Sequence, residues 1–181
     1  MNYKSQNIDA ILLACKKQDQ KAQLELYQRY HMNAYHAAYR ILKNSDDAMD
    51  AMQEAFILAF QRLNQFSGVG NFGGWIHKIV VRKSIEYYHK NKSTVFEDEL
   101  DNNIMLSENP EDLEAKESKI NAGQLEKALN KISQRYQIIL KLYYLEGYDH
   151  SEISEIMNWS PSNCRTTLSR AREQLKKHLN E

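Results

Sequence analysis

Four polar side chains near the C-terminus have the chemistry needed to contact DNA. They recur at helical spacing on one side of a helix predicted over residues 161–177, and they are Arg165, Thr166, Ser169 and Arg170. Guanidinium groups pair bidentately with guanine, and hydroxyl groups hydrogen-bond to bases or phosphates. Glu173 is the only acid between Pro161 and Lys177. The pattern favours a DNA-binding face, although any amphipathic helix also has a polar face that is merely solvated.

Two short helices with a tight turn, over residues 147–172, are predicted to position this face. Asp149 and Glu152 have the spacing of a capping box, in which each side chain accepts a hydrogen bond from the other's backbone N–H. Asn158 stands where a left-handed residue ends a helix, Ser160 caps the next helix, and Pro161 takes its first position. The apolar side of the second helix consists of Cys164, Leu168, Ala171 and Leu175. This is the form of a helix-turn-helix whose second helix reads the major groove.

A glycine-rich stretch, residues 66–74, forms a second candidate site. Four of the chain's 6 glycines fall here, but no G-x-G-x-x-G follows a strand, so a dinucleotide site is excluded. A loop holding Phe66, Asn71 and Phe72 could cradle an unpaired base through aromatic faces and amide hydrogen bonds. The alternative, which the spacing alone favours, is an ordinary helix–helix connection anchored by two phenylalanines.

The helix predicted over residues 75–92 strengthens the nucleic-acid interpretation. It combines cations with aromatic rings: Tyr87, Tyr88 and His89 lie among Lys78, Arg82, Lys83, Lys90 and Lys92. Cations neutralise phosphates, and rings stack on exposed bases. Trp75, at the start of this helix, is expected to lie in the core.

Three further helices are predicted before the glycine-rich stretch. The first spans residues 8–17, and the second runs from a cap at Asp19 to a stop at Asn44, with Leu24 on its apolar side. The third follows a cap at Ser45 and has Met49 on its apolar side. The acids in its first turns, Asp46, Asp47 and Asp50, suit a positive helix N-terminus. Gln53 and Glu54 are expected to face outward.

Charge divides the chain into three parts. Residues 1–92 carry 13 Lys and Arg against 8 Asp and Glu, residues 93–118 carry 1 against 9, and residues 119–181 carry 10 against 7. The acidic stretch can bury little and is predicted to be a flexible linker. The last part is predicted to hold four helices, with Leu125 on an apolar face, Ser133 as a cap and Gly147 as a stop. The prediction is an all-α protein with domains at 1–92 and 119–181.

Several kinds of chemistry are excluded by what the sequence lacks. It has no HExxH, CxxC pair, GxxxxGK[ST] or G-x-S-x-G motif, and its 6 histidines have no metal-ligand spacing. We therefore expect no enzyme, no cofactor and no bound metal. Cys15 and Cys164 fall at apolar helical positions and are expected to be core thiols. The polar N-terminus and the lack of a long apolar run predict a cytoplasmic protein without membrane insertion.

Both halves resemble one family, the extracytoplasmic-function sigma factors of the sigma-70 class. DAMDAMQEAFILAFQRLNQF and FGGWIHKIVVRKSIEYY, in residues 47–88, are similar to the family's region 2. LNKISQRYQIILKLYYLEGYDHSEISEIMNWSPSNCRTTLSRAREQL, residues 129–175, is similar to its region 4. Region 4 alone resembles many helix-turn-helix regulators, but the two regions in this order are specific to the family.

The resemblance implies two DNA-binding roles. In region 4, the positions that bind the −35 element are Ser162, Arg165, Thr166, Ser169, Arg170, Arg172 and Lys176. In region 2, the positions that bind the melted −10 strand are Phe66, Asn71, Phe72, Lys78, Arg82 and Lys83. Departures from the family's usual residues, among them Arg82 and Gly73-Gly74, leave the preferred promoter sequence open.

The resemblance also implies protein partners. The residues expected to dock on the clamp helices of the RNA polymerase β′ subunit are Asp47, Asp50, Gln53 and Glu54. Core polymerase, including its β flap, promoter DNA and an anti-sigma factor are the expected partners. Two rival hypotheses are a free-standing helix-turn-helix regulator, which leaves the first half without a role, and a scaffold protein that binds no nucleic acid.

Overall fold

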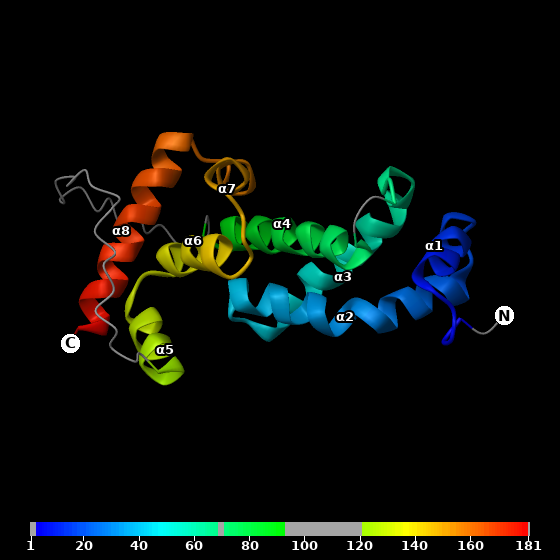
Figure 1. The fold of residues 1–181 in the computed structure, drawn as a ribbon, viewed down its shortest axis with the longest axis horizontal. Helices are drawn as coiled ribbons and strands as arrows, with labels where there is room; N and C mark the ends of the chain where they lie inside the picture. Colours follow the sequence, from blue (N-terminus) through cyan, green and yellow to red (C-terminus); the bar gives the residue numbers. More distant parts are fainter. Residues whose placement is uncertain (1–2, 69–70, 93–120, 181) are drawn as a thin grey trace. The chain divides into compact units, whose positions relative to one another are not determined.

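The computed structural model describes residues 3–68, 71–92 and 121–180, and every regular element among them is helical. The all-α fold class is therefore confirmed for the described residues. The chain divides into two compact units, Met1–Glu97 and Asp98–Glu181, whose elements are labelled in Figure 1. The predicted linker, residues 93–118, lies outside the described residues. Each unit is described below by itself.

The N-terminal unit is built on three long helices. They are α2 (Gln20–Leu42), α3 (Ser45–Gln61) and α4 (Phe72–Lys92), and each packs against the other two. The shorter α1 (Ile8–Lys16) packs on α2 and on the 3-10 turn η1 (Leu63–Gln65). Alanines form much of the interface: Ala48, Ala51, Ala55 and Ala59 of α3 are fully buried. Such small side chains let neighbouring helices approach closely, so α3 turns its longer polar residues outward.

Two predicted core positions are wrong. Leu24 of α2 is 57% exposed and Met49 of α3 is 42% exposed. The buried side of α2 passes instead through Leu26 and Ala37, and that of α3 through Ala48. In α3 the close approach of the helices buries Ala48 and not its larger neighbour Met49. In α2 the buried residue is Leu26, which has the same size as Leu24, so there the direction of the buried side differs from the prediction.

Helix boundaries also differ from the prediction at two places. Lys43, with φ of 57°, is the left-handed C-cap of α2, and Asn44 rather than Ser45 caps α3 by accepting the N–H groups of Asp46 and Asp47. Helix α4 begins at Phe72 instead of Trp75, because the Asn71 side chain accepts the Gly73 N–H at 2.8 Å. A side-chain cap thus offsets the low helix propensity of the two glycines that follow.

The first residues of the chain are fastened to α2. The Tyr3 hydroxyl donates to Asp19 at 2.8 Å, and this hydrogen bond, the largest cause, lowers the Asp19 pKa below its usual value. The Arg29 guanidinium donates to the carbonyl oxygens of Tyr3, Lys4 and Gln6 at 3.0, 3.2 and 3.1 Å. Arg29 also forms an ion pair with Glu25 at 2.8 Å, and this contact holds the guanidinium in position to bind the backbone of residues 3–6.

The C-terminal unit packs three helices around one. Helix α8 (Pro161–Leu179) contacts α5 (Ala122–Lys131), α6 (Gln134–Tyr144) and α7 (His150–Met157). The core of the C-terminal unit includes Ile138, Ile139, Leu142, Ile153, Met157, Cys164 and Leu168, each at most 1% exposed. Leu125, predicted to be apolar core, is 39% exposed. Helix α6 ends at Tyr144, and Gly147, with φ of 72°, lies in the turn beyond it.

The caps predicted for α7 and α8 are confirmed. Asp149 accepts the Glu152 N–H at 2.8 Å, and Glu152 accepts the Asp149 N–H at 3.1 Å. Asn158 is left-handed, with φ of 54°, and Ser160 accepts the Asn163 N–H at 3.1 Å. These local contacts fix the turn between α7 and α8.

Replacing Asp149 with alanine leaves the Glu152 N–H without its acceptor. We expect the free energy of unfolding of the C-terminal unit to fall by about 1 kcal/mol. The measurement is urea denaturation of the full-length chain, followed by Trp159 fluorescence in a Trp75→Phe background. Asp149→Asn is the control, because its amide oxygen can still accept. An equal loss in both variants would show that the negative charge, not the cap, carries the effect.

Candidate functional site

The polar face of α8 is backed by a buried apolar side. Cys164, Leu168 and Ala171 are at most 1% exposed and hold the helix against its unit. Among the predicted DNA contacts, three are exposed and four are partly buried. The exposed ones are Ser162, Arg165 and Lys176, and the partly buried ones are Thr166, Ser169, Arg170 and Arg172. The structure therefore places these residues on the polar side of α8, and only part of the predicted surface is exposed.

A contact that the sequence did not reveal fixes the start of α8. The Arg135 guanidinium lies 4.5 Å from the centre of the Trp159 ring and donates to Asn163 at 3.2 Å and to Thr167 at 3.4 Å. Thr167 is 5% exposed and also donates to Asn163 at 3.0 Å. A cation in the first turn of α6 is unfavourable, because it lies next to the positive end of the helix dipole. This unfavourable position was the signal in the sequence that Arg135 has a tertiary partner.

Arg172 is held by aromatic rings. Its guanidinium carbon lies 5.2 Å from the centre of the Tyr143 ring and 5.5 Å from that of Tyr144. These contacts position the side chain against the end of α6 by cation–π attraction. Its predicted contact with phosphate stays a prediction.

The two phenylalanines of the glycine-rich stretch are core residues in this conformation. Phe66 is 6% exposed and Phe72 is 3% exposed. Together with Trp75 they form a cluster whose ring centres lie 5.5 to 5.8 Å apart, and Tyr30 packs on Phe72 at 5.3 Å. The structure thus shows the anchoring contacts expected for an ordinary helix–helix connection. Direct stacking of either ring on a base stays a prediction.

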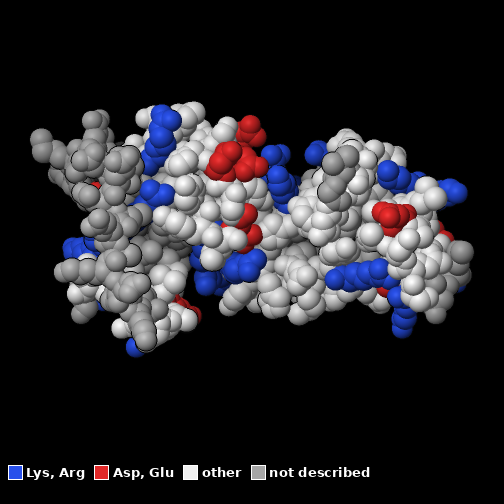
Figure 2. Space-filling model, viewed as in Figure 1, with Lys and Arg blue, Asp and Glu red and all other residues white. Residues whose placement is uncertain are grey.

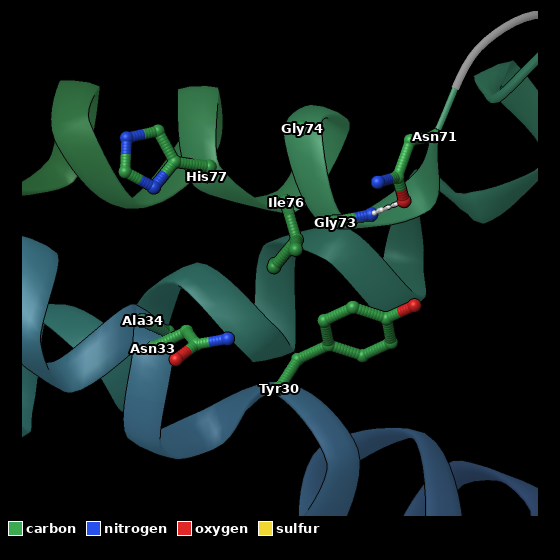
Figure 3. A pocket seen from close by; sticks show the side chains of 8 residues that line it. All are labelled: Tyr30, Asn33, Ala34, Asn71, Gly73, Gly74, Ile76 and His77. Carbon is green, nitrogen blue, oxygen red and sulfur yellow. Dashed lines mark hydrogen bonds between the residues drawn. The ribbon is translucent and has the colours of Figure 1, made fainter. Parts of the chain in front are cut away.

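A cavity of 360 Å³ lies between α2 and the first turns of α4. Its lining residues, shown in Figure 3, are Tyr30, Asn33, Ala34, Asn71, Gly73, Gly74, Ile76 and His77. A Cβ atom on Gly73 would lie 3.1 Å from the Tyr30 ring, whereas one on Gly74 would meet open space. Tyr30, Asn33 and His77 were not predicted as site residues. The paired glycines beside two aromatics were a signal of such a hollow.

The predicted cations of α4 differ in their surroundings. Lys78 and Arg82 are exposed one turn apart. Lys83 is partly buried, with its amine 2.6 Å from Glu86 and 3.8 Å from Glu54. On the face in Figure 2, and for the described residues, Lys and Arg side chains stand among uncharged residues without forming one continuous patch.

The predicted polymerase-docking residues share the outer side of α3. Asp50, Gln53 and Glu54 are exposed, and Asp47 is partly buried. Two apolar side chains lie on the same side at one-turn spacing from Gln53, with Met49 42% and Ile57 59% exposed. A polar helix face that also exposes large apolar groups is typical of a protein-binding surface.

Residues of α4 hold two of these acids. The Tyr87 hydroxyl donates to Glu54 at 2.7 Å, and the Asn91 amide donates to Asp47 at 2.9 Å. The hydrogen bond to Glu54, with smaller effects of burial and nearby acids, raises the Tyr87 pKa to about 12. Glu54 and Lys83, which were predicted for two different sites, are therefore neighbours.

Other chemistry finds no support in the described part of the chain. No group of three or more potential metal ligands occurs there. Both cysteines are buried and free, and burial raises the Cys15 pKa to about 11, so this thiol is protonated at neutral pH. None of the described helices is long and apolar enough to cross a membrane.

The two units match known protein families separately. Sigma-70 region 2 matches residues 26–94, and Sigma-70, region 4 matches residues 122–175. The ECF RNA polymerase sigma factor SigW of Bacillus subtilis (strain 168) is 28% identical over 179 residues, covering 92% of this chain and 93% of SigW. The RNA polymerase sigma factor SigV of the same organism is 30% identical over 158 residues, covering 86% of this chain and 90% of SigV.

Solved structures share the fold. The sigma factor RpoE, in complex with the anti-sigma factor NepR from Bartonella quintana, has a TM-score of 0.53 at 18% identity, covering 86% of this chain and 95% of RpoE. CnrH, in complex with the cytosolic domain of CnrY, has a TM-score of 0.51 at 19% identity, covering 94% of this chain and 96% of CnrH.

A helical unit that matches region 2, followed by a helix-turn-helix unit that matches region 4, defines a sigma-70-type transcription factor. The chain belongs to the extracytoplasmic-function sigma factors, a family of non-enzymatic factors that direct promoter-specific transcription initiation. The resemblance stated from the sequence is confirmed. The free-standing regulator is not favoured, because the match to region 2 gives the first half a role.

Phe72 can be tested for a structural role. Phe72→Ala should lower the free energy of unfolding by about 3–5 kcal/mol, as is usual for a buried phenylalanine. Phe72→Leu should keep most of the stability and, if the ring only anchors the loop, also keep promoter opening. The measurements are thermal unfolding and permanganate reactivity of unpaired thymines in the presence of core polymerase. A stable Phe72→Leu variant that fails to open DNA would show that the ring stacks on a base.

Proposed function

We propose that the two units divide promoter recognition, with α8 binding the −35 element and the start of α4 binding the melted −10 strand. The observation that carries this proposal is the polar face of α8, whose opposite side is anchored by Cys164, Leu168 and Ala171. A helix held in this way can enter the major groove without losing its packing.

At the −35 element, two roles are proposed for the polar residues of α8. Arg165 and Arg170 are proposed to read base edges, with Thr166 and Ser169 between them. Ser162, Arg172 and Lys176 are proposed to hold phosphates, which fixes the position of the helix on the duplex. The Arg135–Trp159 contact supports this arrangement, because it fixes where α8 starts.

At the −10 element, the cavity beside α4 is proposed to receive an unpaired base. Its 360 Å³ falls within the usual range of ligand pockets, about 300–1,000 Å³. The Tyr30 ring offers a stacking surface, and the side chains of Asn33, Asn71 and His77 offer polar groups. Lys78, Arg82 and Lys83 are proposed to bind the adjoining phosphates, while Phe66 and Phe72 support the loop from behind.

Docking on polymerase is proposed for the outer side of α3. Asp47, Asp50, Gln53 and Glu54 would contact the β′ clamp helices, and the exposed Met49 and Ile57 would add apolar area to the contact. The C-terminal unit is proposed to contact the β flap. This assignment places the protein in the cytoplasm, where core polymerase acts.

An anti-sigma factor is the proposed regulator. RpoE and CnrH, which share this fold, were solved in complexes with NepR and with the cytosolic domain of CnrY, respectively. These complexes support the class of partner and leave its identity open.

Reconstituted transcription tests the function as a whole. The full-length chain is mixed with bacterial core polymerase and genomic fragments of the source organism, and the transcripts are sequenced from their 5′ ends. Discrete starts that share upstream motifs, and that vanish without this protein, are expected. Binding to duplex DNA by the free protein, with no initiation and no binding to core polymerase, would favour the free-standing regulator.

Arg170→Ala should weaken −35-dependent initiation by about one to two decades, because a bidentate arginine–guanine contact contributes about 1–3 kcal/mol of discrimination. The measurement is transcript yield from a promoter found above, at limiting holoenzyme. Lys177→Ala, an exposed cation on the same helix with no proposed contact, is the control. Unchanged yield in the Arg170 variant would refute its base contact.

Asp50→Ala combined with Gln53→Ala should weaken binding to core polymerase without unfolding the chain, because both side chains are exposed. We expect about a tenfold or greater rise in the dissociation constant, which corresponds to about 1.4 kcal/mol. The measurement is fluorescence anisotropy of the labelled chain titrated with core polymerase. Gln28→Ala on the exposed side of α2 is the control. Full affinity of the double variant would exclude this docking surface.

A further inference from the structure

Helices α3 and α4 face each other through a polar ladder. On α4 the ladder consists of Lys83, Tyr87 and Asn91, which are spaced one turn apart. Lys83 and Tyr87 contact Glu54 of α3, and Asn91 contacts Asp47 of α3. The ladder thus joins a residue of the proposed DNA surface, Lys83, to a residue of the proposed polymerase surface, Glu54. Neither proposed site by itself requires this contact.

Glu54 is held through both carboxylate oxygens. Tyr87 donates to Oε1 at 2.7 Å, and the Lys83 amine lies 3.8 Å from Oε2. Tyr87 therefore orients the carboxylate so that its second oxygen faces the amine. The exposed fraction of the Lys83 side chain is 21%, against 48% for Glu54, so the carboxylate is the more accessible partner.

Lys83 is consequently neutralised in the free protein. Its amine lies between Glu54 and Glu86, the latter at 2.6 Å, so one positive charge faces two negative charges. A phosphate that approaches this amine meets a local net charge of −1. The contact with Glu86 joins residues three apart on one helix, and such an exposed pair yields readily to a competing anion.

We propose that Glu54 is an interlock that keeps Lys83 from promoter phosphate until core polymerase binds. This inference rests on the proposed function of the two surfaces. When a cation of the polymerase takes the Glu54 carboxylate, the local net charge around Lys83 rises to zero and its tether to α3 is released. Lys83 then turns to the phosphate of the melted strand, and Tyr87 acts as the positioning residue of the device.

The coupling must act in both directions. If polymerase at Glu54 strengthens the contact between Lys83 and DNA, then DNA at Lys83 strengthens the contact between Glu54 and polymerase by the same factor. An exposed ion pair contributes about 0.2–1 kcal/mol, which corresponds to an effect of about 1.4- to fivefold. The interlock is thus a bias toward binding DNA after polymerase.

The test uses Glu54→Gln, which removes the charge as polymerase would. Binding of the free full-length variants to a fluorescein-labelled thymidine oligonucleotide is followed by anisotropy over a range of salt concentrations. We expect Glu54→Gln to tighten binding about 1.4- to fivefold. We also expect the slope of log K against log salt to steepen by about 0.7, the value of one added phosphate contact on a single strand.

Two further variants separate release of Lys83 from a general change in charge. Asp50→Asn makes the same change in net charge one turn away on α3, where no ion pair with Lys83 occurs, and it should leave the salt slope unchanged. In a Lys83→Met background, Glu54→Gln should no longer alter either affinity or slope. If Glu54→Gln tightens binding equally in that background, or does nothing in the wild-type chain, the interlock is overturned.

Promoter opening by the holoenzyme distinguishes failure of the interlock from failure of the proposed function. Suppose that Lys83→Met impairs promoter opening but Glu54→Gln leaves the salt slope of the free protein unchanged. The interlock is then overturned, and the DNA role of Lys83 remains. Lys83→Met that changes neither opening nor oligonucleotide binding would overturn both.

Discussion

Close approach of helices through small side chains is the constraint on which both units depend. In α3 the buried stripe is Ala48, Ala51, Ala55 and Ala59, and in α8 it includes Cys164 and Ala171. These small residues let neighbouring helices pack closely around the larger buried side chains, which include Met52, Phe56 and Leu168, while the polar residues lie on the opposite side. The proposed polymerase surface of α3 and the proposed DNA surface of α8 are these opposite sides. Each functional face therefore follows from packing on the helix's other side.

Contacts within one or two helical turns could be predicted from the sequence. The capping box of Asp149 and Glu152, left-handed Asn158 and the Ser160–Pro161 start depend on residues at fixed local spacing, and each is confirmed. Leu24 and Met49 are apolar but lie outside the buried sides of their helices, where Leu26 and Ala48 are buried instead. Helix α4 begins three residues before the predicted Trp75, because the Asn71 side chain caps it although two glycines lie in its first turn.

Contacts between helices distant in sequence could not be predicted in this way. The cavity combines Tyr30 and Asn33 of α2 with the glycines of α4, and the ladder combines Glu54 of α3 with Tyr87 of α4. Helical periodicity gives the outward direction of each residue on its own helix, but it does not give which outward residues of two helices meet. Arg135 shows the same limit: a cation at a helix N-terminus is unfavourable unless it has a partner, but only the structure identifies that partner as the Trp159 ring.

The net charge of the whole chain predicts weak long-range attraction to DNA. The formal net charge is zero, and the cations of α4 include Lys83, which faces two carboxylates. Long-range attraction to DNA is therefore small, and affinity must come from short-range contacts at two places. Two weak modules on one chain gain affinity together only when their sites are correctly spaced, and they lose this gain otherwise. If the two units divide promoter recognition as proposed, the factor discriminates by promoter spacing as well as by base contacts, because a single matching element engages only one unit.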